Sequence, residues 1–214
     1  MSIAELLSLN PSRREEVTNL FEGLVTVRSF SNFVRILHER YERRPLGLSS
    51  GPSRFGPIAT PIEMVAVAPS FRVLYMAVDL ATAAYETVIR DRYDLEPSRI
   101  LLPADYRGWV VVNISTSLDA TVTLVDLTDG NAIRHGVPSD VTNYSAHRDG
   151  QYFASFVHAN MPTVDGFLYR SRFTNRRNIA VFERAIDRLA TGTTLPLTRD
   201  LLSSAISSWN VNVN

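Results

Sequence analysis

A glutamate lies among apolar side chains in residues 71–91, and it is the first candidate for chemistry in this sequence. Apolar residues recur there at helical spacing: Leu80, Ala83, Ala84, Val88 and Ile89. On a helix with about 100° per residue, Glu86 lies about 60° from Ala83, so its carboxylate faces the apolar side. A carboxylate in such a place is either paired with an arginine or used in chemistry.

Two arginines complement this carboxylate. Arg54 is flanked by Pro52 and Pro57 in a Pro-, Gly- and Ser-rich stretch, residues 43–63, which predicts a long loop. An arginine on a stiffened loop is suited to binding an anion, although a solvated surface charge has the same pattern. Arg35 lies beside a predicted apolar face, and it has the same two interpretations.

The glutamate is positioned by a predicted strand followed by a helix. Residues 73–77 form a short apolar run, typical of a strand covered on both faces. Asp79 is a candidate N-cap of the helix that follows. We therefore expect a central strand at residues 72–78, with Tyr75 reaching a cleft.

The remaining pattern predicts an α+β fold with a mixed, bent β-sheet core and flanking helices. No internal repeat or domain boundary is visible, so residues 1–214 are expected to form one domain. Its expected parts are a helical extension at 1–30, a core at 33–183 and a tail at 184–214. Further helices are predicted at 12–26, 32–41, 147–159 and 199–207, strands at 100–102, 108–115, 121–127, 167–172 and 178–182, and turns at 128–146.

Composition excludes several classes of protein. The formal net charge is zero, which argues against a nucleic-acid binder, and the absence of cysteine excludes disulfides and thiolate metal sites. Four scattered histidines do not predict a metal site. The first 16 residues lack the features of a signal peptide, and no apolar run reaches the roughly 20 residues of a membrane span. All 22 basic residues are arginine, which fits either a GC-rich genome or selection against lysine in a protein acting inside a eukaryotic cell.

Common catalytic motifs are missing. The sequence contains no GxGxxG, GxxxxGK[ST], GxSxG or HExxH pattern. The residues alone therefore predict an α+β domain with an arginine-rich anion site.

Four ordered segments together resemble the RES-domain family, bacterial NAD-consuming toxins usually paired with an antitoxin. FVRI at 33–36 and GPSRF at 51–55 resemble the two arginine motifs of the family. VLYMAVDLATAAYETVIRD at 73–91 resembles its strand–helix segment, and DGFLYRSR at 165–172 resembles its serine segment. The similarity covers about residues 33–183. It implies a fold related to ADP-ribosyltransferase toxins.

The resemblance also implies an activity, cleavage of the nicotinamide–ribose bond of NAD, with NAD as substrate and no other cofactor or metal. The implied catalytic residues are Glu86, Arg54 and Ser171, and the implied substrate-binding residues are Arg35, Arg54, Tyr75, Tyr169 and Ser171. The arginines would hold the pyrophosphate, and Glu86 would stabilise a ribosyl cation.

Three functions remain open at this point. The first is an NAD glycohydrolase or phosphorylase, with water or phosphate as acceptor. The second is an ADP-ribosyltransferase that modifies a protein, and the third is an inactive binding module. The expected partner is an antitoxin or immunity protein, without direct contact to nucleic acid or membrane. The expected location is the bacterial cytoplasm, or a target cell reached by secretion.

Overall fold

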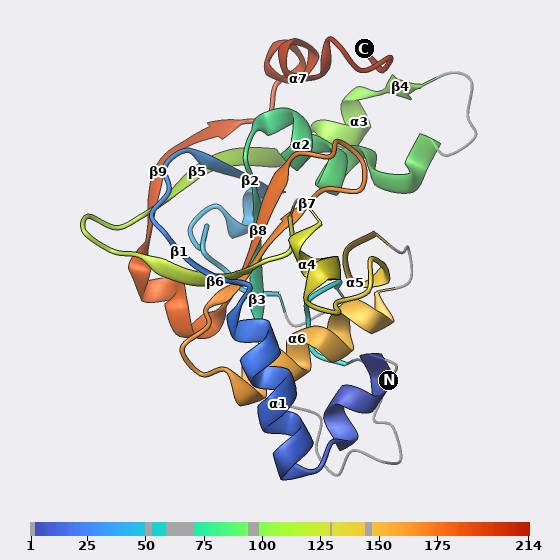
Figure 1. Ribbon diagram of the computed structural model, residues 1–214. Coiled ribbons are helices and arrows are strands. Elements are labelled where there is room, and N and C mark those ends of the chain that lie inside the picture. Colours follow the sequence, from blue (N-terminus) through green and yellow to red (C-terminus); the bar gives the residue numbers. More distant parts are fainter. Residues whose placement is uncertain (1–2, 50–52, 59–70, 94–98, 129, 144–146) are drawn as a thin grey trace.

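A computed structural model describes residues 3–49, 53–58, 71–93, 99–128, 130–143 and 147–214. Its core is one curled, mixed sheet of eight strands with helices on one face (Figure 1). The strand order is β1-β6-β7-β8-β3-β2-β5-β9, in which β6 and β7 run parallel and all other neighbours run antiparallel. The α+β fold with a bent sheet is thus confirmed.

The strands of the main sheet are β1(Val25–Arg28), β2(Phe33–His38), β3(Val73–Ala77), β5(Trp109–Thr116), β6(Val122–Asp126), β7(Gly166–Arg170), β8(Arg177–Phe182) and β9(Leu189–Pro196). Two short strands, β4(Ile100–Leu101) and β10(Asn212–Val213), pair in parallel as a separate small sheet.

The α-helices are α1(Pro11–Glu22), α2(Leu80–Ala84), α3(Pro103–Tyr106), α4(Asn131–Arg134), α5(Asp140–Asn143), α6(Arg148–Asn160) and α7(Arg199–Ile206). A π-helical turn, η3(Tyr85–Ile89), continues α2. The 3₁₀ turns are η1(Ile3–Ser8), η2(Glu39–Tyr41), η4(Arg90–Tyr93) and η5(Glu183–Arg188). Within these described residues, no helix is long and apolar enough to cross a bilayer.

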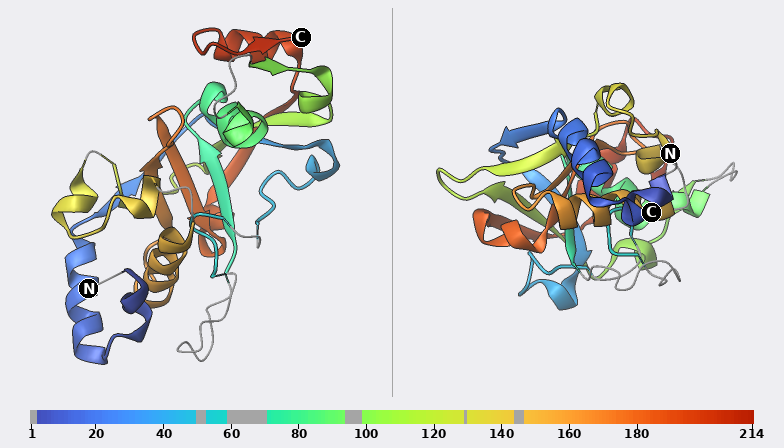
Figure 2. Two further views of the ribbon diagram at one scale, coloured as in Figure 1. Left: turned by 90° about the vertical axis from the view of Figure 1, so that its right-hand side faces the viewer. Right: turned by 60° about the horizontal axis from the view of Figure 1, so that its bottom comes forward.

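The two faces of the sheet are covered differently. On one face, side chains from seven of the eight strands pack against one another and against η5, because the sheet curls over itself. The other face carries two groups of helices. One group contains α1 and α6, the other contains α2 and α7, and they lie at opposite ends of the molecule (Figures 1 and 2). The alternation along β3 follows this arrangement, since Leu74 and Met76 face the curled side and Val73 and Tyr75 the helices.

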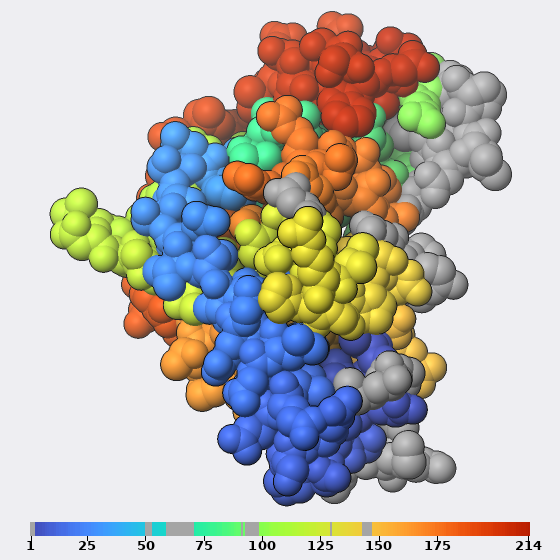
Figure 3. Space-filling model, in the orientation of Figure 1, coloured from blue at the N-terminus to red at the C-terminus, as the bar shows by residue number. Residues whose placement is uncertain are grey.

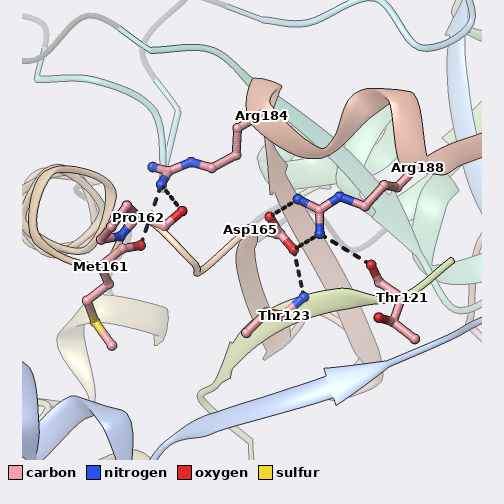
Figure 4. A network of polar contacts seen from close by, with 7 residues as sticks. All are labelled: Thr121, Thr123, Met161, Pro162, Asp165, Arg184 and Arg188. Carbon is pink, nitrogen blue, oxygen red and sulfur yellow. Dashed lines mark hydrogen bonds and ion pairs between the residues drawn. The ribbon is translucent and has the colours of Figure 1, made fainter.

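An ion pair with a buried carboxylate fixes the segment between α6 and β7. Asp165 is almost fully buried, and its carboxylate accepts two hydrogen bonds from Arg188 at 2.6 and 2.7 Å and one from the Thr123 amide at 2.8 Å (Figure 4). Beside it, Arg184 donates to the carbonyl of Pro162 at 2.8 Å. These bonds hold β6, η5 and the start of β7 together.

Several predicted elements are confirmed. The strand at 72–78 is central in the sheet, and the Asp79 carboxylate caps α2 by accepting from the Thr82 amide at 2.8 Å. Helices at α1, α6 and α7 and strands at β4 to β8 lie where the pattern predicts them.

Other predictions are wrong. The helix predicted at 32–41 is wrong for most of its length. Phe33–His38 form strand β2, which is buried on both faces, so its apolar residues imitate helical spacing, and only Glu39–Tyr41 form a 3₁₀ turn, η2. The predicted helix at 12–26 ends at Glu22, and β1 follows it and pairs with β6. The extension at 1–30 is therefore not only helical. The predicted tail contains β9, which pairs with β5.

Candidate active site

A cavity of about 320 Å³ opens on the helix-covered face of the sheet, between the two helix groups. Its floor comes from neighbouring strands: Tyr169 on β7 pairs with Asn178 on β8, which pairs with Ala77 on β3. These side chains share one face because paired residues of adjacent strands point the same way. Tyr75 lies two residues before Ala77 and lines the cavity as well. The expectation that Tyr75 reaches a cleft is confirmed.

Glu86 forms part of the cavity wall from the π-helical turn η3. Such turns are rare and are often found at functional sites. The Glu86 carboxylate is half-buried, and its Oε1 accepts a hydrogen bond from Asn178 Nδ2 at 2.9 Å. The donor of this hydrogen bond is the side-chain amide of Asn178, and it is not an arginine. The structural alternative, a simple arginine salt bridge, therefore does not account for the position of Glu86.

Arg54 enters the cavity from the described segment 53–58, here called the Arg54 loop, which several contacts hold in place. The Tyr75 hydroxyl accepts a hydrogen bond from the Phe55 amide at 2.8 Å and donates one to Ser53 Oγ at 3.0 Å. Gln151 Nε2 of α6 donates to the Ser53 carbonyl at 3.1 Å. The Phe55 ring is fully buried and stacks on Phe167 with ring centroids 4.5 Å apart. Pro52, one of the two prolines expected to stiffen this loop, lies outside the described residues.

The surroundings of Arg54 shift the pKa of its guanidinium. Its side chain is buried, and this burial lowers the pKa of the guanidinium, whereas Tyr169 and Glu86 act in the opposite direction. Glu86 therefore lies within the electrostatic range of Arg54. A buried guanidinium near a carboxylate places opposite charges on two sides of one cavity.

Arg35 lines the same cavity from β2. Strands β2 and β3 share one paired position, Val34 with Ala77, and Arg35 follows that position directly. Its Nη1 donates to the Pro45 carbonyl at 3.0 Å, and burial lowers its pKa to about 10, so it remains charged at neutral pH. The expected convergence of Arg35 and Arg54 on one cavity is confirmed, although 19 positions separate them in the sequence.

The two tyrosines of the cavity are neutral. Burial raises the pKa of Tyr75 to about 12, and burial raises the pKa of Tyr169 well above its usual value, with Glu86 adding to both shifts. Neither phenol is available as a base near neutral pH. Because the Tyr75 hydroxyl binds the Arg54 loop, its observed role in the structure is to position that loop.

Ser171 is not among the residues that line the cavity. It is 2% exposed, and its Oγ accepts hydrogen bonds from the amides of Phe173 at 3.2 Å and Thr174 at 3.4 Å. The hydroxyl thus stabilises the turn between β7 and β8. Two residues of this turn, Arg172 and Phe173, do line the cavity. The catalytic role assigned to Ser171 remains a prediction.

Several cavity residues were not singled out by the sequence: Arg90, His147, Arg172, Phe173 and Asn178. One feature of the sequence does point to Asn178. Asparagine is uncommon in strands, and here it is the first residue of the apolar run NIAVF. Its contact with Glu86 spans 92 positions and could not be read from local pattern.

The charges that line the cavity favour an anionic ligand. Among the described residues that line the cavity, one carboxylate, that of Glu86, stands against four guanidinium groups, those of Arg35, Arg54, Arg90 and Arg172. Among the described residues, no group of three or more His, Asp or Glu side chains gathers as a metal site would require. The arrangement suits a substrate with negative groups and one centre that becomes positive near Glu86.

The fold and sequence match a known class of protein. The chain resembles a chain in the crystal structure of the M. tuberculosis MbcT–MbcA toxin–antitoxin complex, with a TM-score of 0.61 and 14% identity, over 90% of this chain and 98% of that one. This likeness shows the fold. The model of the RES domain matches residues 32–200, and the chain therefore belongs to the RES domain family.

A curated relative is also similar in sequence. The chain is 26% identical over 101 residues to a Sinorhizobium fredii protein named "Probable toxin y4kH". The aligned part is 46% of this chain and 80% of that relative. The β1 strand and the end of α7 lie outside the family match, although both are part of the folded molecule.

Proposed function

We propose that this protein is a toxin that destroys NAD by breaking the bond between nicotinamide and ribose, with water or phosphate as the acceptor. The observation that carries the proposal is the composition of one cavity. It contains a carboxylate, Glu86, that is held by an amide, and two arginines, Arg35 and Arg54, from distant segments. Family membership supports the same function.

The charges of the cavity fit the charges of NAD. The pyrophosphate carries two negative charges, and Arg35 and Arg54 supply guanidinium groups for charge-assisted hydrogen bonds. This interaction would hold the substrate in both the ground state and the transition state. It is therefore expected to act mainly on binding.

Glu86 has a different task in this proposal. When the C–N bond breaks, its electron pair goes to the nicotinamide nitrogen and the ribose carbon becomes a cation. The Glu86 carboxylate stabilises that cation, and water or phosphate then forms the new bond to the same carbon, with a proton released when water is the acceptor. Nicotinamide leaves as a neutral molecule, so no acid is required. The neutral tyrosines of the cavity are compatible with this scheme.

An antitoxin partner is part of the proposal. The M. tuberculosis structure is a toxin–antitoxin complex, and the S. fredii relative is named a probable toxin. An enzyme that consumes NAD would harm the cell that makes it, so we infer that a partner protein restrains this one in the bacterial cytoplasm until it acts.

Product analysis tests the activity. Purified protein is incubated with NAD, with and without phosphate and with and without cell lysate, and the products are identified by mass spectrometry. The proposal predicts free nicotinamide together with ADP-ribose or its 1-phosphate. ADP-ribose found on a protein of the lysate would instead identify an ADP-ribosyltransferase. Unchanged NAD in every mixture, from folded protein, would contradict both.

A further inference from the structure

The floor of the cavity contains a buried polar atom whose hydrogen bond is missing. Asn178 is 1% exposed and lines the cavity. Its Nδ2 donates to Glu86 Oε1 at 2.9 Å, but its Oδ1 is buried and has no partner among the described residues. Buried polar atoms are almost always paired, because an unpaired one costs about 1–3 kcal/mol.

The orientation of the Asn178 amide is fixed by chemistry. An ionised carboxylate only accepts hydrogen bonds, so the NH₂ group must face Glu86 and the oxygen must face elsewhere. Asn178 lies in β8 between Tyr169 and Ala77, and all three face the cavity. The unpaired acceptor therefore belongs to a residue of the cavity floor beside Glu86, and Oδ1 itself is covered by neighbouring atoms.

We infer that Asn178 is a specificity residue whose Oδ1 accepts a hydrogen bond from a neutral donor on the nicotinamide–ribose half of the substrate. This inference rests on the proposed function. Two groups of NAD have that chemistry: the carboxamide NH₂ of nicotinamide and a hydroxyl of the adjacent ribose. A carboxylate at the same place would meet two acceptors, Asn178 Oδ1 and Glu86, and would be rejected.

The inference separates two tasks within one side chain. The Nδ2 orients Glu86, and its loss would slow every substrate by a similar factor. The Oδ1 selects the substrate, and its loss would remove the preference for a substrate with the donor. If Asn178 only orients Glu86, its replacement slows all substrates by a similar factor and leaves the substrate preference unchanged.

The test combines variants of Asn178 with altered substrates and measures kcat/KM for each pair. The first substrate analogue is nicotinic acid adenine dinucleotide, which replaces the carboxamide with a carboxylate. The second is NAD that lacks the 2′-hydroxyl of the nicotinamide ribose. Comparing ratios between wild type and variant cancels the intrinsic reactivity of each analogue.

Asn178→Ala is the main variant. We expect the wild type to prefer NAD to one analogue, and the preference to shrink about 10- to 100-fold in Asn178→Ala, as the loss of one buried hydrogen bond predicts. If the ratio of kcat/KM for NAD to that for the nicotinic acid analogue changes, the carboxamide is the donor. A change with the deoxy analogue identifies the ribose hydroxyl. An unchanged ratio for both analogues overturns the inference while the proposed function stands.

Asn178→Asp keeps the shape and an acceptor oxygen but loses the donor to Glu86. Turnover of NAD is expected to fall, and its pH profile to move upward, because two adjacent carboxylates share a proton. The preference for NAD over the informative analogue should remain at least as large as in the wild type. Loss of that preference would contradict the role of the oxygen. If the folded wild type turns over no NAD at all, the proposed function fails, and this inference fails with it.

Discussion

The Arg54 loop and the Ser171 turn both border the cavity, and they present their motif residues in opposite ways. In the loop, the backbone is bound by Tyr75 and Gln151, and the motif arginine itself lines the cavity. In the turn, the motif serine binds the backbone, and its neighbours Arg172 and Phe173 line the cavity. A residue of a sequence motif can therefore either meet the ligand or hold the chain that meets it.

Within this comparison of loop and turn, the close packing of the loop gives the largest expected effect. A Cβ atom at Gly150 of α6 would lie 2.5 Å from the Arg54 carbonyl and 3.0 Å from the Val141 carbonyl. Gly150→Ala should therefore displace Arg54, lower the free energy of unfolding by about 1–3 kcal/mol and reduce kcat/KM for NAD at least about tenfold. Thermal melting and NAD turnover measure the two effects. Gly192→Ala on β9 is the matched control, since a Cβ there meets Asn113 at an ordinary 3.4 Å.

If Gly150→Ala leaves turnover intact, Arg54 does not need its observed position. The loop would then be a packing element only, and the contrast with the Ser171 turn would disappear.

The hydroxyl of Tyr75 gives the next effect. Tyr75→Phe leaves the Phe55 amide and Ser53 Oγ without this partner, which is expected to cost about 1–3 kcal/mol and to raise KM for NAD more than it lowers kcat. Tyr106→Phe is the control, because the Tyr106 hydroxyl also makes a hydrogen bond: it donates to the Asn214 carbonyl at 2.7 Å, in the C-terminal part of the chain. The control should lose stability without a change in KM. If Tyr75→Phe and Tyr106→Phe have the same KM for NAD, the positioning role of Tyr75 is contradicted.

The position of the C-terminal part supports this choice of control. Residues after 200 lie outside the family match and form the red end of the molecule, which packs beside α2 (Figure 3). They do not line the cavity, although Trp209 touches Tyr85, the neighbour of Glu86, with ring centroids 5.0 Å apart.

Ser171 gives the smallest expected effect. Ser171→Ala removes two hydrogen bonds to backbone amides, at 3.2 and 3.4 Å, and is expected to lower the free energy of unfolding by about 1 kcal/mol. If the serine only shapes its turn, kcat/KM per folded molecule should fall less than about fivefold. A loss of about 100-fold or more in a well-folded variant would show that the hydroxyl also acts on the substrate, as the sequence motif predicts. Both loop and turn would then present their motif residues directly.

The part of the fold that was predictable from the sequence is the part with local signals. The strand–helix unit of β3 and α2 has an apolar run, an N-cap aspartate and helical spacing, and all three are correct. The sequence of strand β2 predicts a helix because burial on both faces removes the two-residue alternation. Strand β9 was missed because it is an edge strand, LATGTTLP, with glycine, threonine and few buried residues.

The site, like the fold, has a part that the sequence predicts and a part that it does not. Residue type and order identified Glu86, Arg35 and Arg54 as candidates, and the structure brings them to one cavity. The sequence could not show that Tyr75 binds the loop or that Asn178 holds Glu86, because those hydrogen bonds join residues 20 and 92 positions apart. Such contacts depend on strand register, which local pattern does not determine.

The most direct measurement of the central claim is NAD turnover by Glu86→Gln, with its melting temperature taken on the same preparation. The variant keeps the shape and removes the charge, while Glu15→Gln on the exposed face of α1 is the control for the same chemical change. If Glu86 stabilises a ribosyl cation, kcat should fall about 10²–10³-fold, with little change in KM or in melting temperature. Turnover close to that of the wild type in a folded Glu86→Gln protein would contradict the account and remove the carboxylate from the mechanism.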